Sequence, residues 1–269
     1  MKRAKVVWII LLVQVLIFAI PAFADKRIVE FSSTETPPFW SANLPEDGMA
    51  GEILHAISKE IGVKSVIKYI PMERIRKNLT SNHVGNPEIF SGQEFSAIVT
   101  IAVFRVAFFY YRPNHKKEIH YTGLDDIKGF KLGIIRGTLG DVSFLHEKGI
   151  EVEPSNSEIS LIKKLRYGRI DLCSMVKLTG FYKINSIFPK DAENFAYFDI
   201  KGSVRPITIM IDKTYPDGRD LGEKYSNGLE RIIESGAYTE ILEKYYGRGK
   251  IPRDWFMQLE KFKVSQGRH

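Results

Sequence analysis

Two periods of apolar residues alternate along the chain, and they predict strands and helices in turn. Apolar runs rich in β-branched residues predict strands at 28–32, 65–70, 95–103, 106–111, 130–135, 170–176 and 204–211. Apolar residues three and four positions apart predict helices at 51–61, 72–79, 157–167, 178–187, 218–235 and 239–246. We expect 239–246 to be the last helix, because the tail from Gly247 ends basic and polar.

The β-α-β order occurs once in 26–111 and again in 130–211, which predicts two mixed α/β lobes. The polar segment 114–120 is a plausible crossing between them. Pro206 points to an edge or crossover position for the later strand, because proline cannot donate to a sheet ladder.

The first 24 residues read as a secretory signal peptide. Lys2, Arg3 and Lys5 form a basic start, 6–20 is uncharged and apolar, and Ala22-Phe23-Ala24 fits a cleavage site. The apolar run is short for a membrane span, although an uncleaved anchor is the alternative. Since no cysteine lies near the cleavage site, we expect an exported periplasmic protein that is not a lipoprotein.

Composition excludes several classes of function. The net charge is +7 and falls to +4 without the basic residues of the leader, with no basic block of the kind that binds nucleic acid. The single cysteine, Cys173, allows no internal disulfide and no thiolate metal cluster, and it reads as a buried, inert thiol. The histidines show no metal-binding spacing, and there is no G-x-S-x-G. We therefore expect no metal, no cofactor and no enzymatic activity.

The stretch 35–62 organises the first half of the chain. A strand leads into the loop 36–40, which two prolines keep out of a helix, and a core helix follows from Gly51. In α/β proteins ligands usually bind at such carboxyl ends of strands. The alternative is a surface loop whose aromatic residues pack on the core.

Four segments of the chain stand out together. They are P-P-F-W…G-M-A-G-E-I-L-H-A-I-S-K-E-I-G at 37–62, L-D-D-I-K-G-F-K-L-G-I-I-R-G-T at 124–138, L-R-Y-G-R-I-D at 165–171 and G-A-Y-T-E-I-L-E-K-Y-Y-G at 236–247. They resemble segments of one family, the periplasmic solute-binding proteins of the polar amino-acid type (bacterial extracellular solute-binding protein family 3). Each is weak alone, but their order and separations fit across the whole mature chain. P-M-E-R-I-R at 71–76 further resembles a subgroup with P-W-x-R-A.

The resemblance implies an α/β, two-lobed fold like the type II periplasmic binding proteins, with mixed sheets, helices on both faces and two hinge strands. Lobe 1 would comprise 25–112 and 212–269, and lobe 2 would be inserted as 113–211. A small solute would bind between the lobes of a monomer, and the membrane permease of an ABC-type importer would read the closed state.

The same resemblance implies a site for a carboxylate. Arg105, in T-I-A-V-F-R, matches the arginine that grips the ligand's α-carboxylate, with Thr100 in the same segment. Thr138 and Leu139 match the point where the second lobe offers a hydroxyl and backbone N–H groups. The alternatives are a snorkelling side chain for Arg105 and a helix cap alone for Thr138.

Other residues would shape the ligand pocket. Phe39 and Trp40 would form an apolar wall, and Met72 stands where the family often has a stacking aromatic. Arg74 points either into the cleft or to solvent.

Two departures from the family concern the ligand's ammonium group. Val176 and Ser33 stand where the family has acids, and Glu35 is the candidate counter-charge. Because a buried ammonium needs a partner, a standard amino acid fits poorly, and the ligand is expected to be a carboxylate without that amine, an aromatic acid, a short peptide, or none with high affinity. A dehydratase-like enzyme on the same scaffold and a ligand sensor docking on a membrane receptor are the alternative functions.

Overall fold

The computed structural model describes residues 27–71, 74–75, 80–90, 92–117, 119–136 and 142–266. The predicted signal peptide lies outside these residues. Within them, every helix is too short or too polar to cross a bilayer.

One sheet of eight strands runs through the molecule in the order β2-β1-β3-β8-β4-β7-β5-β6. The pairs β1–β2, β1–β3, β5–β6 and β5–β7 are parallel, whereas β8 is antiparallel to β3 and β4, and β4 to β7. The strands are β1 (Ile28–Ser33), β2 (Lys64–Tyr69), β3 (His83–Gly85), β4 (Phe95–Tyr111), β5 (Lys131–Ile135), β6 (Glu151–Ser155), β7 (Leu172–Val176) and β8 (Phe195–Asp212).

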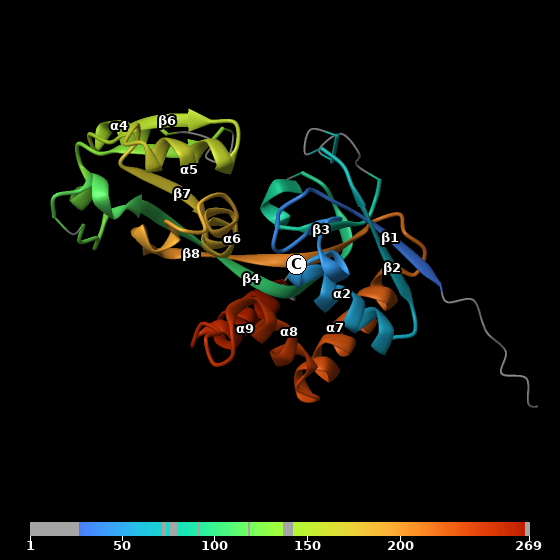
Figure 1. Cartoon of the computed structure of the whole chain (residues 1–269). Helices are drawn as coiled ribbons and strands as arrows, with labels where there is room; N and C mark the ends of the chain where they lie inside the picture. Colours follow the sequence, from blue (N-terminus) through green and yellow to red (C-terminus); the bar gives the residue numbers. More distant parts are fainter. Residues whose placement is uncertain are drawn as a thin grey trace, which may run out of the picture.

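The helices form two groups, which Figure 1 shows at the two ends of the long strands β4 and β8. The group nearer the N-terminal strands is α2 (Met49–Glu60), α7 (Gly218–Glu234), α8 (Ala237–Tyr246) and α9 (Trp255–Gln266). The other group is α4 (Ser143–Glu147), α5 (Glu158–Arg166) and α6 (Lys177–Ile187). Short 3₁₀ turns are η1 (Pro45–Asp47), η2 (Pro87–Phe90), η3 (Arg112–Asn114), η4 (Leu124–Ile127) and η5 (Ala192–Asn194).

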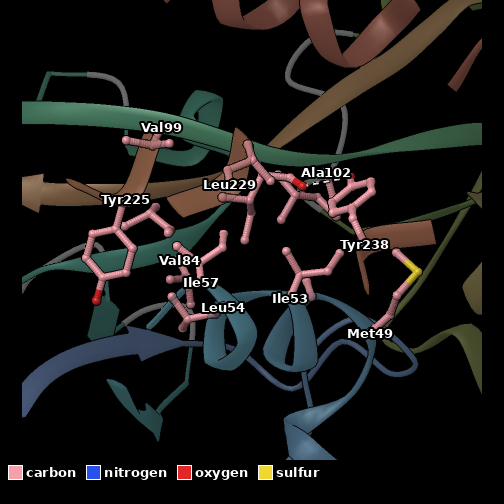
Figure 2. Packing of buried hydrophobic residues seen from close by; sticks show 14 of the residues in the cluster. Met49, Ile53, Leu54, Ile57, Val84, Val99, Ala102, Tyr225, Leu229 and Tyr238 are labelled. Carbon is pink, nitrogen blue, oxygen red and sulfur yellow. Dashed lines mark hydrogen bonds between the residues drawn. The ribbon is translucent and has the colours of Figure 1, made fainter. Parts of the chain in front are cut away.

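The first lobe has a core built from both ends of the chain. The apolar stripe of α2 packs against α7 and α8 beneath the strands, as Figure 2 shows for Ile53, Leu54, Tyr225, Leu229 and Tyr238. These side chains are at most 1% exposed. The N-terminal strands therefore depend on helices that follow β8 for most of their cover.

The second lobe has its own core of two clusters, one under α5 and α6 and the other near α4 and η4. Along β4 the core changes between Val103 and Ala107, and along β8 it changes between Ile200 and Val204. The two cores thus meet inside these strands. The lobe ranges expected from the sequence, with boundaries at the strand ends, stay a prediction.

Several element predictions were wrong at the hinge and at the C-terminus. β4 is a single strand where the sequence predicted two, and β8 begins at Phe195 and not at 204, since the irregularities in both strands are shifts of register and not strand ends. β3 lies in a segment for which the sequence predicted no strand. α9 was missed, although Trp255, Leu259 and Phe262 have helical spacing and bury against the first lobe.

Candidate functional site at the hinge

A bulge in β4 marks the first-lobe side of the hinge. Thr100 pairs with Thr208 and Ala102 with Ile207, so Ile101 is an extra residue without a ladder partner. Its carbonyl instead accepts a hydrogen bond from the hydroxyl of Tyr238 at 2.8 Å. The hydroxyl of Tyr238 in turn accepts a hydrogen bond from the indole N–H of Trp255, the first residue of α9, at 3.2 Å. Helices α8 and α9 are thereby joined to the bulged strand.

A wider irregularity in β8 lies opposite. Val204 pairs with Arg105, whereas the next pair is Ala107 with Asp199, so 200–203 loops out of the ladder. Gly202 has φ +74°, a conformation that glycine adopts without steric cost. The Ser203 hydroxyl donates to the carbonyl of Val106 at 2.8 Å. Side-chain bonds thus replace ladder bonds where the two lobes join, and bulged strands bend there.

Arg105 lies on the face of β4 that α9 covers. Its Nη2 donates to Oδ1 of Asp254 in an ion pair between side chains that are 21% and 36% exposed. This hydrogen bond holds the pKa of the Asp254 carboxyl below its usual value. Nε of Arg105 is buried and has no hydrogen-bond partner among the described residues. The fork of the guanidinium is therefore only partly used.

A cavity of about 450 Å³ opens beside this ion pair. It is lined by Arg105, Asp199, Ile200, Lys201, Gly202, Val204, Asp254, Gln258, Lys261 and Phe262. Ile200 packs on the core of the second lobe and Phe262 on that of the first. The cavity thus lies between the lobes, and its volume suits a small molecule.

The loop with Phe39 and Trp40 lies elsewhere. Both side chains are 3% exposed and belong to the first-lobe core. Their role as a wall of the ligand pocket stays a prediction. The rings of Phe39 and Phe104 contact each other edge-on, with their centroids 6.4 Å apart. Phe104 and Arg105 point to opposite faces of the sheet, because successive side chains in a strand alternate. Val176 packs against the same cluster from the second lobe. This group therefore forms an apolar contact between the lobes, apart from the cavity.

The start of α2 fixes that loop. Backbone N–H groups of Met49 and Ala50 donate to the carbonyls of Pro38 and Phe39 at 2.8 and 3.0 Å. The loop thus satisfies N–H groups that a helix N-terminus otherwise leaves open.

The remaining residues singled out by the sequence are not brought together. Thr100 is buried in the sheet, Glu35 is exposed and accepts from the backbone N–H of Ala42 at 3.1 Å, and Arg74 is exposed. Met72, Thr138 and Leu139 lie outside the described residues. Their roles in binding stay predictions.

The sequence did not predict a hydrogen-bonded group of Asp47, His55 and Tyr69 at the end of β2. Asp47 accepts from the hydroxyl of Tyr69 at 3.2 Å and lies 2.9 Å from Nε2 of His55. Burial, followed by the charge of Asp47, raises the pKa of the Tyr69 hydroxyl. Asp47 and His55 are eight residues apart and Tyr69 is 22 residues from Asp47, and the three follow no motif, so the fold is needed to bring them together.

Comparisons with known proteins place the fold. No family model matches the sequence, and no curated protein does. An ancestral arginine-binding protein bound to arginine is similar in structure, with TM-score 0.62, 22% identity and coverage of 82% of this chain and 99% of that one. A histidine kinase sensor domain similar to periplasmic binding proteins has TM-score 0.61 at 17% identity, covering 83% and 96%. A substrate-binding protein of an amino acid ABC transporter has TM-score 0.57 at 16% identity, covering 82% and 100%. The expected type II periplasmic binding protein fold is therefore confirmed.

Proposed function

We propose that this chain, which has the fold of the periplasmic binding proteins, is an exported solute-binding protein. It captures a small carboxylate-bearing solute between its lobes and delivers it to an ABC-type importer. The observation that carries the proposal is the cavity between the two cores, at the point where both connecting strands are irregular. A solute bound there touches both lobes and so favours one relative arrangement of them.

Arg105 is the residue that we expect to receive the carboxylate. It lines the cavity, and its guanidinium is held in place by Asp254. A carboxylate competes with Asp254 for the guanidinium or takes the donors that this ion pair leaves unused. A solute held by Arg105 in this cavity lies between residues of α9 and the looped-out segment 200–203 of β8.

The test is thermal stability of the chain without residues 1–24, measured against amino acids, monocarboxylates, dicarboxylates and short peptides. We expect Arg105→Ala to abolish the rise in Tm that a hit compound causes in the parent protein. Asp254→Ala is the matched control, because it breaks the same ion pair but leaves the cation, and it should retain the response. Equal responses in the parent and Arg105→Ala would remove Arg105 from the site, and a panel without any hit would contradict solute binding.

A sensor role is the second candidate, and the similarity to a kinase sensor domain favours it. The two roles separate in cells. Deleting the gene should abolish uptake of the hit compound if the protein serves an importer, whereas a sensor would leave uptake intact and lose the transcriptional response. Consumption of the hit by purified protein would support the dehydratase alternative instead.

A further inference from the structure

Both carboxylates that line the interlobe cavity already have cationic partners. Asp254 accepts from Arg105 and from the side-chain amide of Gln258, the latter at 3.2 Å. Asp199 accepts from the ammonium of Lys177 at 2.9 and 3.1 Å. Neither carboxylate is left over to neutralise an ammonium group on a solute.

Two lysines of the cavity, in contrast, have no acidic partner among the described residues. Lys201 lies in the looped-out part of β8, next to Ile200 of the second-lobe core, and Lys261 lies on α9 of the first lobe. One lysine therefore lines the cavity from each lobe. Together with Arg105 they give the lining an excess of positive charge.

This pattern of charge discriminates between classes of solute. A solute's ammonium group would lose water and gain no free carboxylate, and the two lysines would repel it. A second anionic group would instead gain an attractive partner on one side of the cavity while Arg105 holds the first.

We infer that the cavity takes a small solute with two negative charges and no ammonium group, of the size of a short dicarboxylate. The inference rests on the proposed function and adds the charge of the solute to it. Lys201 and Lys261 are the residues that distinguish this solute from an ordinary amino acid.

Isothermal titration of the chain without residues 1–24 tests the inference with matched compounds. The probes are the straight-chain dicarboxylates from malonate to pimelate, the half-amide of each, aspartate and glutamate, and inorganic phosphate. At least one dianion should bind about tenfold or more tightly than its half-amide, and tighter than the amino acid of the same length. A preference for phosphate over every dicarboxylate would also support a dianion site, with both charges on one group.

Lysine variants show whether the preference arises in this cavity. Lys201→Ala and Lys261→Ala should each weaken the dianion about tenfold and leave the half-amide nearly unchanged. Lys59→Ala, an exposed lysine of α2 far from the lining, is the control and should change neither. If an amino acid or half-amide binds as tightly as the dianion, the inference is wrong while solute binding stands. If every probe fails, and the wider panel gives no Arg105-dependent response, both are wrong.

Discussion

The hydroxyl of Tyr238 offers a sharp test of how the C-terminal helices are joined to the hinge strand. It donates to the carbonyl of Ile101, the bulged residue of β4, and accepts from the indole of Trp255. Tyr238→Phe removes one oxygen and keeps the ring. It leaves a carbonyl and an indole N–H without their partner in a region closed to water.

The magnitude follows from burial. Tyr238 and Ile101 are 0% exposed and Trp255 is 1% exposed, so water cannot replace the lost bonds without a rearrangement. A buried polar group left unsatisfied costs about 1–3 kcal/mol, and two such groups give an expected loss of about 2–6 kcal/mol in the free energy of unfolding.

Urea denaturation of the chain without residues 1–24, followed by circular dichroism, measures this loss as a lower midpoint at constant slope. Tyr245→Phe, on the same helix, is the matched control. Its hydroxyl is partly exposed and lies 3.5 Å from Glu52, so we expect a change under about 0.5 kcal/mol. If both variants lose the same free energy, the bulge carbonyl does not depend on Tyr238 and the reasoning is refuted.

Three further predictions concern the hinge pair and the second lobe. A double-mutant cycle of Arg105→Ala and Asp254→Ala should give a coupling of about 0.5–1 kcal/mol at pH 7, because the pair is partly exposed. Since the pKa of Asp254 is lowered in the folded state, this coupling should be complete above about pH 4 and vanish as the pH falls through the lowered pKa. Urea unfolding of the four proteins of the cycle from pH 2 to 7 checks the size of the coupling and its loss at low pH. Gly180→Ala should lower the free energy of unfolding by about 1–3 kcal/mol, because a Cβ there would meet the buried ring of Phe109 on β4. Gly123→Ala is the control. It has open space around it and an extended backbone, so it should be nearly neutral in the same urea titration. Cys173 should resist a thiol reagent in the native protein and react in urea, since burial raises the pKa of its thiol; rapid native labelling would contradict that burial.

The alternation of strands and helices was largely predictable, because each element carries an apolar period that depends only on neighbouring residues. The continuity of β4 and β8 was not. A bulge changes pairing with another strand, and the extra residue, such as Ile101, is as apolar as its neighbours. The sequence therefore suggested broken strands where the sheet continues with a shifted register.

The hinge cavity shows the same limit. Arg105 stood out because it is a charge within an apolar run, a signal that one segment can carry. Its partner Asp254 is 149 residues away and directly precedes α9, in a segment expected to be a polar tail. Lys201 and Lys261 look like ordinary surface lysines until the fold places them at one cavity.

The divided first core has a consequence for the order in which the chain can fold during synthesis. All buried members of the second-lobe clusters have been made once the chain reaches Ala196, whereas the first core still lacks Tyr225, Leu229, Tyr238 and Trp255. The inserted half can therefore complete its core first, while β1 and α2 wait with apolar surface exposed. If the chain is exported, as we propose, such a delay would help to keep the N-terminal half unfolded until export. Pulse proteolysis of chains arrested near 200 and near 269 would show whether protection appears in that order.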